Sequence, residues 1–182
     1  GVLDCRKALQ ETNGDFDKAV AYLREKGLAS AAKRAGREAK DGLIELYSHG
    51  GGRVGVMVEV NCETDFVART EQFRTFAHDI ALQVAAANPR YLDVSDVPAE
   101  VLESETTIAR NRALQEGKPE KVLDKIVEGR LEKFYQEACL LRQPFVKDES
   151  LTIDGLLKQT VAALGENVII RRFARWELGE AV

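Results

Sequence analysis

The sequence predicts an α+β fold: a small helical module, then a core in which about three antiparallel strands pack against helices. Two patterns carry this prediction. Val54, Val56, Val58 and Val60 recur at every second position, the period of a strand with one buried face. A helical stripe follows, made of Phe73, Phe76, Ala77, Ile80, Ala81 and Val84. Together with the hairpin and the final strand described below, these patterns sum to about three antiparallel strands backed by helices.

Residues 1–27 predict the helical module. Val2, Leu3, Ala8 and Leu9 mark a first helix, which Asn13-Gly14 interrupts. Asp15 or Asp17 caps a second helix, which we expect to stop at Gly27. So few apolar residues cannot hold a domain alone, so we expect a further helix upstream of Gly1.

Residues 28–41 predict a helical connector. Its alanines favour a helix, and its lysines and arginines are compatible with a basic contact surface. Glu38 and Asp41 dilute that charge, which favours a solvated connector.

Residues 42–182 predict the α+β core, which opens with a hairpin. Residues 43–47 and 53–60 are the two strands, joined by the glycine run at 50–52. A phosphate-binding loop would instead join a strand to a helix and carry a G-K-[ST] sequence. We therefore expect neither a nucleotide nor another cofactor to bind here.

Helix patterns separate this hairpin from a final strand. Pro98 opens one helix, which ends near Gly117, and Pro119 opens another, which Pro144 terminates. The last helix stops at Gly165. Residues 168–178 then predict the third strand.

Composition excludes several function classes. The 182 residues include 26 basic and 30 acidic side chains, a net charge of −4, so direct nucleic-acid binding is not expected. No apolar run reaches the length of about 20 residues that a membrane span needs. Cys5, Cys62 and Cys139 form no C-x-x-C pair, so we expect no metal site. The odd cysteine count and the lack of a secretory signal indicate a cytoplasmic protein.

The polar turn between the valine strand and the Phe73 helix is the leading candidate site, because such turns often carry function. Phe66 lies seven residues before Phe73, in helical phase, which favours a core residue that staples the helix start. Thr64 would then be the N-cap and Asp65 a first-turn acid. The alternative is that the Phe66 ring points outward into a partner.

An enzyme or a metal site is disfavoured at this turn. Three polar side chains alternate along the extended segment, at Glu59, Asn61 and Glu63. With Asp65 they could bind a divalent metal ion through oxygen ligands. Met57 shares their face, however, and charged residues that alternate with valines usually form the wet side of a sheet. We therefore expect a binding or regulatory protein and not an enzyme.

Four blocks, in order and spread from residue 4 to 173, resemble the elongation factor Ts family. They are Asp4-Cys5-Arg6-Lys7-Ala8-Leu9 with Gly14-Asp15-Phe16-Asp17-Lys18-Ala19, then Cys62-Glu63-Thr64-Asp65-Phe66-Val67-Ala68, then Gln143-Pro144-Phe145-Val146-Lys147-Asp148, and last Gly165-Glu166-Asn167 with Arg171-Arg172-Phe173. The resemblance implies a ubiquitin-associated-like module at residues 1–27. It also implies the short form of the family, which has one core half and works as a homodimer. The final strand, where Ala174 replaces a cysteine of some relatives, is the candidate edge for that dimer.

The resemblance further implies a guanine nucleotide exchange factor that promotes GDP release from elongation factor Tu. Its contacts would be Thr64, Asp65, Phe66 and Val67, which disturb the partner's Mg²⁺ and phosphate site, together with Val2 and Leu3. A ubiquitin-associated-like adaptor or peptide-binding protein without exchange activity is the alternative. An adaptor would not need the turn at residues 64–67.

Overall fold

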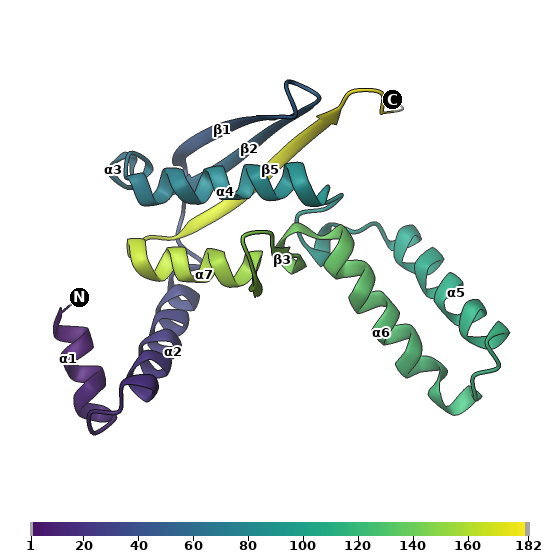
Figure 1. Cartoon of the computed structure of the whole chain (residues 1–182), viewed down its shortest axis with the longest axis horizontal. Helices are drawn as coiled ribbons and strands as arrows, with labels where there is room; N and C mark the ends of the chain where they lie inside the picture. The colour runs from purple at the N-terminus through teal and green to yellow at the C-terminus, as the bar shows by residue number, and fades with distance from the viewer. Residues whose placement is uncertain (1, 181–182) are drawn as a thin grey trace.

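The computed structural model describes residues 2–180 and confirms the α+β prediction (Figure 1). Gly1, where the predicted module begins, and residues 181–182, where the predicted core ends, lie outside the described residues. The main elements are α1 (Val2–Glu11), α2 (Phe16–Arg34), β1 (Asp41–His49), β2 (Val54–Cys62), α3 (Asp65–Ala68), α4 (Glu71–Ala87), α5 (Ala99–Gln115), α6 (Glu120–Ala138), β3 (Pro144–Phe145), β4 (Asp148–Thr152), α7 (Ile153–Leu164) and β5 (Val168–Glu177).

The predicted strands form one antiparallel sheet in the order β1-β2-β5. Val58 of β2 lies opposite Glu45 of β1 and Phe173 of β5. The β2–β5 register shifts between Glu59 and Val60. The sequence did not predict a second, two-stranded sheet, which pairs β3 with β4.

The core lies on one face of the three-stranded sheet. Helix α4 crosses this face, and α7 lies beside α4 (Figure 1). Val58 and Val60 of β2 are fully buried there with Phe73 and Ile80 of α4. The period-two valines and the helical stripe are therefore two halves of one core, as the sequence predicts.

The opposite face of the sheet carries large exposed apolar side chains. They are Ile44 and Leu46 of β1, Met57 of β2 and Trp176 of β5. The register places Leu46 opposite Met57, and Met57 opposite Ala174. This set of five residues, Ile44, Leu46, Met57, Ala174 and Trp176, is called the outer sheet face below.

The predicted helix stop at Gly27 is wrong, because α2 continues to Arg34. Asp15 caps the helix as expected, with its carboxylate accepting from the Lys18 amide at 3.1 Å. A Cβ at Gly27 would lie 3.2 Å from the Cβ of Ala162 on α7. Gly27 thus serves a close helix–helix approach and not a helix end, so the first part of the predicted connector continues α2.

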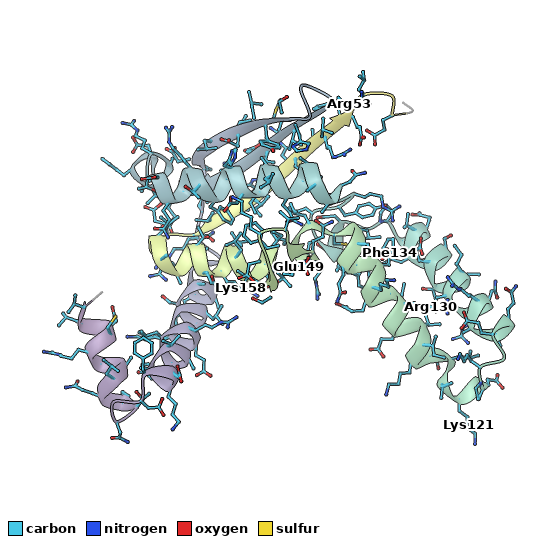
Figure 2. All side chains as sticks on the ribbon, in the orientation of Figure 1. Arg53, Lys121, Arg130, Phe134, Glu149 and Lys158 are labelled. Atoms are coloured by element: carbon cyan, nitrogen blue, oxygen red, sulfur yellow. The ribbon has the colours of Figure 1, made fainter. Side chains whose placement is uncertain are left out.

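Helices α5 and α6 form a hairpin that projects away from the sheet (Figure 1). Phe134 lies near its base and Lys121 near its tip (Figure 2). Helix α6 ends at Ala138, well before Pro144. Buried Gln143 explains this end, because its amide donates to the carbonyls of Glu137 (2.9 Å) and Ala87 (3.3 Å), near the ends of α6 and α4.

Candidate functional site

The turn between β2 and α4 contains a helix of its own. Thr64 has an extended backbone, and its hydroxyl accepts from the Val67 amide at 3.4 Å, so it is the N-cap of α3. Arg69 and Thr70 separate α3 from α4, and Thr70 caps α4 by accepting from the Phe73 amide at 3.3 Å. The predicted Thr64 cap is confirmed, but it starts the short α3 rather than the long helix.

This separate helix turns Phe66 outward. The Phe66 side chain is 79% exposed, although Ala68 is buried and Val67 packs against the core. The break at Arg69-Thr70 removes Phe66 from the helical phase of Phe73, which is fully buried. The staple interpretation is therefore wrong, and a large ring stands in solvent on an otherwise anchored turn.

Glu166, in the corner between α7 and β5, holds the start of this turn. One of its carboxylate oxygens accepts from the backbone amides of Glu63 (3.1 Å) and Thr64 (3.0 Å). The other accepts from the Thr64 hydroxyl at 2.7 Å. Three bonds to one carboxylate fix the backbone just before Phe66, and bonds to a charged acceptor are the stronger kind.

Asn167 connects the same corner to the segment between α2 and β1. Its backbone amide donates to the Glu63 carboxylate at 2.6 Å. Its side-chain amide donates to the carbonyl of Arg37 at 2.7 Å. The Arg37 guanidinium in turn lies 3.5 Å from the Glu63 carboxylate. The polar turn and the connector are thus held by neighbouring residues of one corner.

Asp65 and Cys62 complete the local environment of the turn. The half-exposed Asp65 carboxylate pairs with Arg69 at 2.8 Å, one helical turn later. The Cys62 thiol is buried and donates to the Thr64 carbonyl at 3.2 Å. Burial first, and then the charge of Glu166, raise the pKa of the Cys62 thiol to about 11, so it remains protonated at neutral pH.

Val2 and Leu3 lie in a different part of the molecule. Both are on α1 and highly exposed, at 86% and 71%. Helix α1 packs on α2, whereas α3 contacts β1, β2 and α4 (Figure 1). The structure therefore brings Thr64–Val67 together in one turn and leaves Val2 and Leu3 as a separate exposed pair.

The acidic residues considered as metal ligands have other partners. Glu59 accepts from Arg172 at 2.7 Å, which lowers the pKa of its carboxyl. Glu63 is held by Asn167 and Asp65 by Arg69. Among residues 2–180, no group of three or more His, Cys, Asp or Glu side chains could hold a metal ion. Each of these carboxylates is thus engaged by a neighbouring guanidinium or backbone amide.

Two structural features of this region were not predicted from the sequence. Glu166 and Asn167 follow the helix stop at Gly165, but their pairing with residues 63 and 64 spans about 100 positions. The outer sheet face was missed as well. This face could have been predicted from the segment Leu43-Ile44-Glu45-Leu46-Tyr47, because its apolar residues occupy both faces of a strand.

An anchored turn that presents an exposed aromatic ring is typical of a surface that contacts another macromolecule. Comparison with known proteins then assigns the family. The family profile described as Elongation factor TS matches residues 6–180. Elongation factor Ts of Caldanaerobacter subterraneus subsp. tengcongensis is 61% identical over all 182 residues, which cover 91% of its length. The proteins of the same name from Moorella thermoacetica and Carboxydothermus hydrogenoformans are 59% and 58% identical, with 90% and 84% of their lengths covered.

The chain belongs to the elongation factor Ts family, as its four sequence blocks predict. Membership of this family supports a role in nucleotide exchange during translation elongation. No helix within residues 2–180 is long and apolar enough to cross a membrane.

Proposed function

We propose that this protein accelerates GDP release from elongation factor Tu in the cytoplasm, and that Phe66 is the residue that enters the partner. One observation carries the proposal: Phe66 is 79% exposed while the backbone before it is fixed by Glu166. An exposed ring on a mobile loop would lose conformational freedom on binding, and an anchored ring loses less. The site supports contact-driven exchange without covalent chemistry.

The energetic requirement follows from linkage. A factor that binds nucleotide-free partner more tightly than the GDP-bound form must weaken GDP binding by the same ratio. Burial of a phenylalanine side chain contributes about 1.5–3 kcal/mol, and each tenfold step needs about 1.4 kcal/mol. Phe66 can therefore account for a weakening of about ten- to a hundredfold.

Larger effects require further contacts. Asp65 and Val67 flank the ring, and Thr64 sets the direction of α3 by capping it. Val2 and Leu3 provide a second exposed apolar pair on α1. We assign these residues to the same interface, so that the turn disturbs the partner's Mg²⁺ and phosphate site while α1 adds affinity.

Stopped-flow release of fluorescent GDP from elongation factor Tu tests this function. The protein should increase the release rate in a concentration-dependent, saturable way. A matched control is Ile108→Ala, since Ile108 is also an exposed apolar side chain but lies on α5. It should behave as the unaltered protein, whereas Phe66→Ala should be slow. Equal rates with and without the protein would refute the proposal.

We further propose that two copies form a homodimer by packing their outer sheet faces together. Strand β5 is an edge strand, as predicted, but the exposed apolar area lies on the face of the sheet and not along that edge. Contiguous exposed apolar patches mark interaction sites, and two sheets stack well at a separation of about 10 Å. Glu59 and Arg172 on this face neutralise each other at 2.7 Å, so a second copy meets little like-charge repulsion.

Light scattering tests the dimer. Leu46→Glu should give a monomer, because it places a charge on the outer sheet face, directly opposite Met57 of the central strand. The matched control Ile108→Glu adds the same charge to the exposed surface of α5 and should stay dimeric. Since position 174 is alanine, the dimer should also survive reducing agent. A monomeric unaltered protein at low micromolar concentration would contradict the proposal.

A further inference from the structure

The corner between α7 and β5 binds the start of the β2–α4 turn, although the two segments are far apart in the sequence. Glu166 lies about 100 residues after the turn, yet its carboxylate accepts all three bonds described above from Glu63 and Thr64. The bonds stop at Thr64, two residues before Phe66. Glu166 therefore fixes the backbone at the base from which the ring projects.

The next residue holds the connector from the N-terminal module. Asn167 donates to the carbonyl of Arg37 and also, at 3.5 Å, to that of Ala35. Its backbone amide binds Glu63, so the turn and the connector meet at this corner. Arg171 extends the connection, because its guanidinium donates to Asn61 at 3.1 Å and to the carbonyl of Ala39 at 3.5 Å.

We propose that Glu166 is a positioning residue for nucleotide exchange: it holds the Thr64 end of the turn so that Phe66 is presented in the orientation that enters the partner. Asn167 is the second arm of this clamp, which fixes the turn relative to α2 and hence to Val2 and Leu3. The proposal rests on the proposed exchange function. It goes beyond that function because it assigns a role to residues that need not touch the partner.

The carboxylate is well suited to this role. Residues 63 and 64 follow β2, which ends at Cys62, and both of their amides donate to Glu166. Without Glu166 these two donors would need water, and the turn would sample several orientations. Apparent affinity for the partner falls in proportion to the fraction of molecules in the competent orientation, so the exchange rate at limiting factor falls by the same ratio. A fall of that fraction to about one tenth corresponds to a tenfold loss of activity.

The first test measures the clamp alone and needs no partner. Hydrogen exchange read by mass spectrometry should show that Glu166→Ala lowers the protection of the peptide containing Glu63 and Thr64 by about tenfold or more. The matched control is Glu116→Ala, which removes a carboxylate that accepts from Arg112 and Arg130 in the α5–α6 hairpin. The control should leave the turn unchanged. Unchanged protection in Glu166→Ala would overturn the proposal.

The second test measures exchange at limiting factor, well below the half-saturating concentration, and corrects the rate for the folded fraction. Glu166→Ala should lower the rate of GDP release at limiting factor by about tenfold, and Glu166→Gln should be intermediate because an amide keeps one acceptor oxygen. Glu116→Ala should be normal. A normal rate at limiting factor per folded Glu166→Ala molecule would reduce Glu166 to a stability role and refute the proposal.

A double-mutant cycle separates positioning from direct contact. If Glu166 acts through Phe66, then Glu166→Ala should change the rate by less than about twofold in a Phe66→Ala background. If Glu166 itself touched the partner, its loss would cost the same factor in both backgrounds, which would refute the positioning role. Failure of the unaltered protein to accelerate release would instead refute the exchange function, while the hydrogen-exchange result would still report on the clamp.

Discussion

Replacing Phe66 by alanine should separate function from stability, because the ring is presented and not packed. A buried Phe→Ala change costs about 3–5 kcal/mol of folding stability. Phe66 is 79% exposed, so only about a fifth of that cost should apply, or about 0.6–1 kcal/mol. For a chain of this length, 1 kcal/mol lowers the melting temperature by about 2–4 °C.

Phe73→Ala provides the matched comparison. Phe73 is fully buried under the sheet, so the same substitution should cost the full amount of about 3–5 kcal/mol. For nucleotide exchange we expect the reverse, with the larger loss in Phe66→Ala. Phe66→Ala should lower the acceleration of GDP release by about ten- to a hundredfold, the equivalent of about 1.5–3 kcal/mol. Phe73→Ala should remain active per folded molecule.

The assay combines thermal melts followed by circular dichroism with stopped-flow GDP release on the same preparations. Rates are taken well below the lower melting temperature, so that folded protein is compared with folded protein. If Phe66→Ala melts as low as Phe73→Ala and exchanges normally, the ring is a core residue and the reasoning fails.

Three further outcomes are expected. Leu46→Glu should halve the mass measured by light scattering without lowering the helical circular dichroism signal. Gly27→Leu should make residues 2–34 more sensitive to proteolysis, because its Cβ alone would lie 3.2 Å from that of Ala162; unchanged proteolysis would argue against this packing. In a thiol titration of the native protein at pH 8, exposed Cys5 should react first. The Cys62 thiol, with a pKa of about 11, should react slowly at pH 8, because only about a thousandth of it is thiolate at that pH. Its reaction rate should increase as the pH rises. Equal reaction rates for Cys5 and Cys62 would contradict the burial of Cys62.

Much of the core could be predicted because its signals are local. The alternating valines of β2, the stripe of α4 and the stop at Gly165 each act within one element, and each was placed correctly. Gly27 shows where local signals fail. A glycine late in a helical pattern often marks the helix end. At Gly27 the glycine instead allows the close approach of α7. The two contacting residues are more than 130 positions apart in the sequence.

The candidate site likewise has one feature that local sequence predicts and others that it does not. The Thr64 cap could be predicted from sequence, because capping depends on the next three residues. The direction of Phe66 could not, since it depends on the break at Arg69-Thr70 that separates α3 from α4. Glu166 was visible only as part of a family block. Its role depends on a tertiary contact that no periodicity reveals.

Affinity for the two states of the partner tests the central claim most directly. Titration of the protein against nucleotide-free and GDP-bound elongation factor Tu yields a ratio of dissociation constants, and linkage requires the GDP affinity to fall by that same ratio. We expect the nucleotide-free form to bind more tightly, and Phe66→Ala to reduce the ratio by about ten- to a hundredfold. Equal affinity for the two forms would contradict the account.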